Sequence, residues 1–156
     1  MASRRKGRII AFQALYSWEA TKPPVSDLME FRWLDPDKRA ALDEGTAMFS
    51  RAIIAGVVEN IDGVDEAIKK HLKNWDFSRL NRVDLAILRM SVYSLLFQGE
   101  VAPTIVIDEA VDISKEYGGD DSYRFVNGVL DAIRKSAQAD RGRRSGDSPP
   151  IIAQDP

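Results

Sequence analysis

The chain has 156 residues, 44% of them hydrophobic and 29% charged, which suits one globular domain with a hydrophobic core. Its net charge of −2 excludes a polycation, and its lack of cysteine excludes disulfides, thiolate zinc sites and a cysteine nucleophile. No apolar run approaches the roughly 18 residues of a membrane span, and the start "MASRRKGRII" lacks the apolar core of a signal peptide.

The chain begins with a basic segment, in which Arg4, Arg5, Lys6 and Arg8 place four cations within five residues. An amphipathic helical pattern follows directly. Phosphates are the natural partners of such a segment, because guanidinium groups match phosphate oxygens and counterion release favours binding. The alternative is a solvated terminus with no partner, and composition alone does not decide between the two.

Apolar residues recur at helical spacing along the chain, which predicts amphipathic helices. No segment alternates as a strand would. Residues 83–97 are apolar nearly all round, which is typical of a central helix. The other stripes are Ile9, Phe12 and Tyr16; Phe49, Ile53, Gly56 and Val57; Val64, Ile68, Leu72 and Trp75; Val106, Ala110, Ile113 and Tyr117; and Val126, Val129, Leu130 and Ile133.

Capping and turn residues separate these helices. Asp35-Pro36 is typical of an N-cap followed by proline at the first helical position. We expect Asp76 to cap a short turn, and Gly118 to end a helix in the left-handed conformation. The apolar stripes and the capping residues together predict an all-α domain of about six or seven helices.

The stretch "GGDDSYRFVNGVLDAI" opens the last helix. We expect Asp121 or Ser122 to cap it. Gly128 costs helix stability, on the order of 1 kcal/mol, so we expect a neighbouring helix to pass close to its backbone. We expect the Asn127 side chain to form a hydrogen bond to a neighbouring helix or loop.

Tyr123, Arg124 and Phe125 follow the start of this helix. They are residue types that stack on unpaired bases or pair with backbone phosphates. The alternative for Phe125 is a place in a broad core face.

Candidate catalytic residues are few. His71 is the only histidine, and it lies at the edge of an apolar stripe. Asp108, Glu109, Asp112 and Glu116 lie along one helix, where a solvated face explains them better than a hard-cation site. We therefore predict no enzyme activity, no metal and no cofactor.

The sequence changes character at residue 139. Residues 139–156 are polar and rich in glycine and proline. They predict a disordered tail after a domain spanning residues 1–138.

Four blocks resemble the transcription antitermination factor NusB family: "AFQALYSWEA", "NRVDLAILRMSVYSLLF", "APTIVIDEAVDISKEYGGDDS" and "RFVNGVLDAI". They occur in order between about Arg4 and Ile133. The resemblance implies two packed three-helix bundles with an extra helix, in a cytoplasmic protein without enzymatic activity. It also implies binding to the boxA element of ribosomal RNA leader transcripts, together with the small-subunit ribosomal protein NusE, within the RNA polymerase antitermination complex.

The resemblance also assigns roles by position. The RNA-facing residues would be Arg4, Arg5, Lys6, Arg8, His71, Asp121, Ser122, Arg124 and Phe125, and the NusE-facing residues would be Tyr16 and Asp84. Gly7 interrupts the basic run, and we expect it to loosen the start of the first helix. Some family members form homodimers, and the sequence does not decide between monomer and dimer.

Two other functions remain as alternatives. A NusB-like domain also precedes some RNA cytosine methyltransferases, but this chain has no room for a methyltransferase domain. A bundle that binds only proteins would show no specific RNA binding. The antitermination hypothesis predicts about four phosphate contacts. A plot of the logarithm of the binding constant against the logarithm of the salt concentration should then have a slope near −3, from roughly −0.7 per contact.

Overall fold

The computed structural model describes residues 2–73 and 76–146. In these residues the chain forms eight α-helices and one short 3-10 helix, and no strand. The elements are α1 (Arg4–Thr21), α2 (Val25–Met29), α3 (Pro36–Ala40), α4 (Glu44–Glu59), α5 (Ile61–Lys70), η1 (Phe77–Arg79), α6 (Arg82–Phe97), α7 (Pro103–Tyr117) and α8 (Ser122–Gly146). The predicted all-helical fold class is confirmed.

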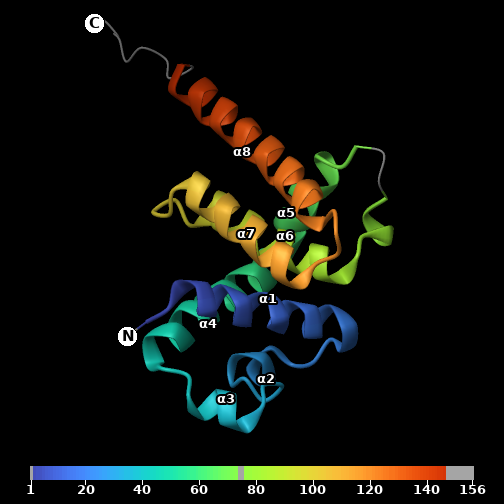
Figure 1. The fold of residues 1–156 in the computed structure, drawn as a ribbon. Coiled ribbons are helices and arrows are strands. Elements are labelled where there is room, and N and C mark those ends of the chain that lie inside the picture. Colours follow the sequence, from blue (N-terminus) through green and yellow to red (C-terminus); the bar gives the residue numbers. More distant parts are fainter. Residues whose placement is uncertain (1, 74–75, 147–156) are drawn as a thin grey trace, which may run out of the picture.

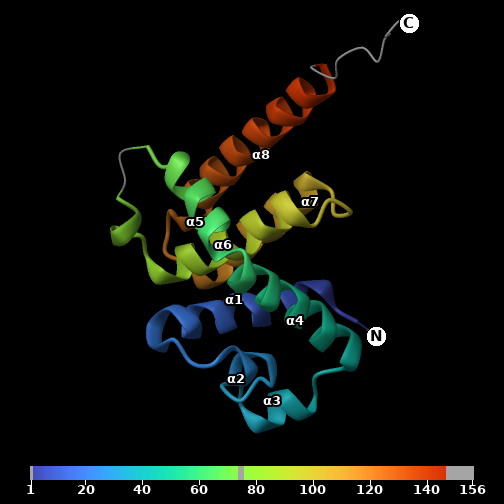
Figure 2. The ribbon, with the colours of Figure 1, turned by 180° about the vertical axis from the view of Figure 1, so that it is seen from behind.

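Helix α6 is the centre of the arrangement. It packs against α1, α4, α5, α7 and α8. Figure 1 shows α1 to α4 gathered at one end and α7 and α8 at the other, with α5 and α6 between them. From behind, α4 and α5 follow one another with only a small change of direction (Figure 2). Because α6 contacts both groups of helices, its residues are buried on nearly all sides, as the apolar sequence predicts.

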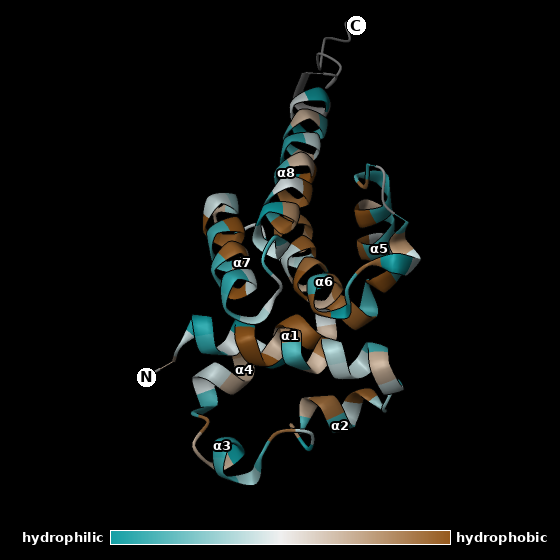
Figure 3. Ribbon diagram, turned by 45° about the vertical axis from the view of Figure 1, so that its right-hand side comes forward, coloured by the Kyte–Doolittle hydropathy of each residue, from teal (hydrophilic) through white to brown (hydrophobic). Residues whose placement is uncertain are grey.

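Most residues of the predicted apolar stripes are buried in the core, but Tyr16 and Tyr117 are 39% and 38% exposed. Ile53, Val57, Val64 and Ile68 are fully buried, and the α8 stripe is at most 5% exposed. Trp75 lies outside the described residues. Hydrophobic faces turn inward between the helices, whereas the far half of α8 is mostly hydrophilic (Figure 3).

An ion-paired arginine joins the central helices α5 and α6 to α1. Arg89 of α6 donates two hydrogen bonds of 2.9 Å to the Asp65 carboxylate of α5 and one of 2.9 Å to Glu19 of α1. Its side chain is only 5% exposed. Burial opposes the charge of Arg89, but the two carboxylates outweigh this effect and raise its pKa.

The capping predictions are confirmed at two helix starts. Asp35 caps α3 with Pro36 at the first helical position, and Asp76 caps η1. The prediction for Gly118 is wrong in its conformation. Gly118 ends α7 with extended backbone, at φ −93° and ψ −178°.

Two expectations about α8 are also wrong. Asn127 and Gly128 are exposed, and a Cβ on Gly128 would meet nothing within 4 Å. No helix therefore passes close to Gly128, which is a tolerated exposed glycine.

The boundary of the tail differs as well, because α8 runs to Gly146 rather than ending near residue 138. A helix that has already formed extends at little cost, and Asp140 pairs with Arg143 one turn on at 3.6 Å. Residues 147–156, the rest of the predicted tail, lie outside the described residues.

Candidate RNA interface

The basic segment forms the first turns of α1. Ser3 caps the helix by accepting a hydrogen bond from the Lys6 amide at 3.2 Å, and the Ser3 amide donates to Thr46 of α4 at 2.9 Å. The first turn contains no acidic residue. Cations at a helix N-terminus oppose the helix dipole, so this placement does not serve the stability of α1.

Gly7 does not loosen α1, which is continuous through it. A Cβ at this position would approach Cδ1 of Phe49 to 2.6 Å. The glycine therefore lets α1 lie close to α4, and this packing holds the basic segment in place.

The four cations of this segment lie in different surroundings. Arg4 and Lys6 are exposed. Arg5 is held by Glu109 and Asp112 of α7, with Arg5–carboxylate distances of 2.8–3.0 Å. Arg8 is only 5% exposed, with its guanidinium 5.3 Å from the centre of the Phe49 ring. Burial lowers the pKa of Arg8, and the nearby Glu109 partly opposes this. Arg8 therefore packs against α4 instead of reaching into solvent with its neighbours.

A cleft of about 300 Å³ opens where the start of α6 meets the start of α8. It brings together three of the predicted RNA-facing residues, Asp121, Ser122 and Phe125. The full lining is Arg79, Leu80, Asn81, Asp84, Gly119, Asp120, Asp121, Ser122 and Phe125.

Tight local turns build both sides of the cleft. Asn81 caps α6, because its side-chain oxygen accepts from the Val83 amide at 2.8 Å. On the other side, the Gly119 amide donates to the Ser122 hydroxyl at 3.0 Å. A Cβ on Gly118 would lie 2.6 Å from Cβ of Ser122, so only glycine allows this loop to fold so closely onto α8. The Ser122 side chain thus fixes the loop that precedes the helix.

Asp84 belongs to this cleft, although we predicted that it faces a protein partner. It is 8% exposed, and its Oδ1 finds no hydrogen-bond partner among the described residues. Burial raises the pKa of Asp84, and the Ser122 hydroxyl partly opposes the rise. A poorly satisfied carboxylate is thus held at the wall of the cleft.

Tyr16, the other residue predicted to face a partner, lines a separate hollow of about 280 Å³. It is 39% exposed, and the hollow is also lined by Phe12, Trp33, Val83 and Tyr117. Because Val83 lies in this hollow and Asp84 in the cleft, the start of α6 separates the two sites.

Besides the four cations of the basic segment, two predicted RNA-facing residues lie outside the cleft. His71 ends α5, with its Nδ1 2.8 Å from the Ala67 carbonyl oxygen, and lines a third hollow between α5 and α8. Arg124 is exposed and donates from Nε to the Tyr123 hydroxyl at 3.0 Å. Phe125 is half-buried: it packs against the core, which was the alternative prediction, and it also lines the cleft.

The sequence reasoning missed Arg79, Asn81 and Asp120 of the cleft. The N-cap pattern at Asn81 is visible in the sequence, but its meeting with α8 depends on how α6 and α8 pack. The acidic face of α7 is exposed as predicted at Asp108 and Asp112. Within residues 2–73 and 76–146, no three histidine or acidic side chains gather as a metal site would require, and no helix is both long and apolar enough to cross a membrane.

Comparison with known proteins places this geometry in a family. The family model described as "NusB family" matches residues 5–135. The transcription antitermination protein NusB of Treponema denticola is 46% identical over 134 residues, which cover 86% of this chain and 97% of the relative.

Solved structures agree with this comparison. A structure of NusB from T. maritima has 36% identity and a TM-score of 0.76, over 86% of this chain and 93% of the other. A crystal structure of the antitermination factors NusB and NusE in complex with double-stranded RNA has 29% identity and a TM-score of 0.76, over 85% and 96% of the two chains.

Proposed function

The chain belongs to the NusB family of transcription antitermination proteins, and from that premise we propose that it binds RNA together with a NusE-like ribosomal protein to promote antitermination. The finer proposal is that the RNA is a single-stranded boxA-like element of a ribosomal RNA leader. The complex would then join RNA polymerase in the bacterial cytoplasm, with residues 1–138 as the binding unit.

The cleft between α6 and α8 carries this proposal. It offers an aromatic ring at Phe125, carboxylate acceptors at Asp84 and Asp121, and a cation at Arg79. Unstacked bases need such a combination, since a ring supports the base face and acceptors bind its amino groups. Arg4 and Lys6 add exposed positive charge for the phosphates.

The hollow around Tyr16 supports the proposed protein partner. An exposed tyrosine that shares a hollow with Trp33 is suited to protein contact, because aromatic residues are enriched at protein interfaces. Its position across the start of α6 from the cleft would let RNA and protein bind side by side. Joint binding raises the affinity of each through effective concentration.

Fluorescence anisotropy with a boxA-like RNA and a scrambled RNA tests the proposal, with and without NusE. We expect a preference for boxA that NusE strengthens. Phe125→Leu keeps apolar bulk and removes the ring, so it should weaken binding by about fivefold to a hundredfold, the range of one stacked base. Phe97→Leu is the matched control, because Phe97 is exposed at the opposite end of α6.

Arg4→Gln with Lys6→Gln should make the salt slope shallower by about 1.4, from roughly 0.7 per phosphate contact. Equal and feeble binding to both RNAs, unchanged by NusE, would contradict RNA recognition and leave a bundle that binds only proteins.

A further inference from the structure

Arg5 is already bound by two carboxylates of its own chain. Its Nε and Nη2 each donate to Glu109 at 3.0 Å, and Nη2 also donates to Asp112 at 2.8 Å. The Arg5 and Asp112 side chains are 53% and 50% exposed, so the cluster is open to solvent. The two acids raise the pKa of Arg5, with Glu109 the larger influence. Arg4 and Lys6 have no ion-pair partner within the part of the chain that the structure describes.

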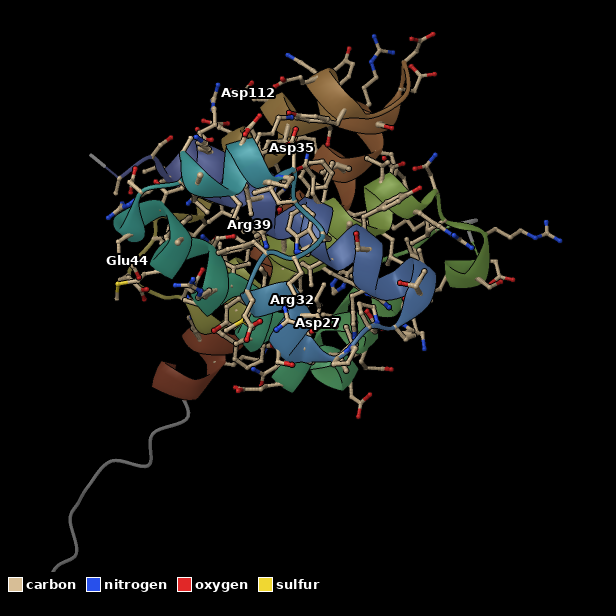
Figure 4. The ribbon with its side chains drawn as sticks, turned by 90° about the horizontal axis from the view of Figure 1, so that it is seen from below. Asp27, Arg32, Asp35, Arg39, Glu44 and Asp112 are labelled. Carbon is tan, nitrogen blue, oxygen red and sulfur yellow. The ribbon has the colours of Figure 1, made fainter. Side chains whose placement is uncertain are left out.

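This contact joins α1 to α7, and both helices pack against α6. Glu109 and Asp112 are three residues apart, so they share one face of α7. Phe12 of α1 meets Tyr117 of α7 edge to face, with ring centres 5.2 Å apart. Figure 4 shows Asp112 beside the first turns of α1. The two acids therefore face Arg5 from a helix that is held in place.

The two carboxylates present to Arg5 what a phosphate would present. A guanidinium binds paired oxygens of carboxylate and phosphate through the same parallel donors. Here Glu109 supplies two oxygens and Asp112 a third. An RNA phosphate can bind these donors of Arg5 only when the carboxylates release them.

We propose that Glu109 and Asp112 compete with RNA phosphate for Arg5, and so set how strongly the basic segment holds RNA. This inference rests on the proposed RNA-binding function. Arg4 and Lys6 are available to any polyanion. Arg5 binds RNA only when a phosphate displaces both Glu109 and Asp112 from its guanidinium. Glu109 and Asp112 thereby limit the affinity contributed by charge alone and leave more of the binding to the cleft.

The test is RNA affinity of the Glu109→Gln/Asp112→Asn double variant, measured by anisotropy at about 0.15 M salt, where unpaired exposed charges are screened. We expect binding tighter by about threefold to tenfold, because an exposed ion pair is worth a few-fold each. Asp108→Asn is the matched control, since it removes an exposed acid of α7 that has no ion pair among the described residues. We expect it to change affinity by less than about twofold, because salt screens exposed charges.

The same pair of changes in an Arg5→Gln background shows whether the acids act through Arg5. If they do, the double variant binds RNA no more tightly than Arg5→Gln alone. A gain that persists without Arg5, an equal gain from Asp108→Asn, or a loss of affinity in the double variant would each overturn the inference. The proposed function fails separately, if the unchanged protein shows no preference for the boxA-like RNA.

Discussion

Replacing Arg89 with alanine should destabilise the fold more than any surface charge change. Arg89 joins α6 to α5 and α1 through three hydrogen bonds of 2.9 Å to two carboxylates. Its guanidinium also lies 5.6 Å from the Trp18 ring and 6.0 Å from the Phe77 ring. Alanine at this position leaves Asp65 without its cation and Glu19 with Lys22 alone, and it leaves a space between the rings.

The size of the effect follows from burial. Breaking a buried ion pair by removing one partner costs about 3–5 kcal/mol, because the remaining charge is left unpaired. Asp65 and Glu19 keep 17% and 30% exposure, so water can reach them in part. We therefore expect about 3 kcal/mol, which corresponds to a fall in melting temperature of roughly 6–12 °C for a chain of this size.

Urea and thermal unfolding followed by circular dichroism measure the change. Arg134→Ala is the matched control, because Arg134 forms a 2.6 Å pair with Asp131 within α8 and its side chain is 26% exposed, against 5% for Arg89. That pair should contribute about 0.3–0.5 kcal/mol. A loss below about 1 kcal/mol for Arg89→Ala, or equal losses for the two variants, would refute the argument that Arg89 holds α1, α5 and α6 together.

Three further substitutions test the packing. Gly128→Ala should raise the free energy of unfolding by about 0.5–1 kcal/mol, because the glycine is exposed in a helix and the new methyl meets nothing; an unchanged or lower value in thermal unfolding would contradict this. Gly56→Ala should lower it by about 1–3 kcal/mol, because the new methyl would overlap the ring of Tyr93; wild-type stability would show that the ring moves aside freely. Asp84→Asn should stabilise the protein at neutral pH, because burial raises the pKa of Asp84 in the folded state and its ionisation therefore costs stability as the pH rises. That advantage should vanish as the pH falls below 3.8, the ordinary pKa of an aspartate. Urea unfolding at several pH values measures it, and an advantage that does not change with pH would contradict the explanation.

The sequence predicted the structure correctly where helical periodicity alone determines which residues are buried. Stripes of apolar residues at helical spacing predicted the buried faces of α4, α5 and α8, because burial of one face stabilises an amphipathic helix whatever its neighbours are. Caps such as Asp35 and Asp76 were also predictable, since capping depends on residues close in sequence.

Features that depend on packing were harder to predict. We expected Gly128 to lie against a neighbouring helix, yet it faces solvent, whereas Gly118 lies against Ser122. Arg8 belongs to a basic run but is buried by the approach of α4, and Asp84 lines the cleft because α8 begins beside it. For Arg8 and Asp84 the neighbour comes from a distant part of the chain.

The central position of α6 has a consequence for synthesis on the ribosome. Helices α1 and α4 bury their apolar faces largely against each other and against α6, which ends only at Phe97. At bacterial rates of about 5–20 residues per second, the first four helices must wait on the order of seconds before α6 is made. During that interval the nascent chain exposes apolar surface near the exit tunnel, so early folding of this protein is tied to the pace of translation through residues 60–97.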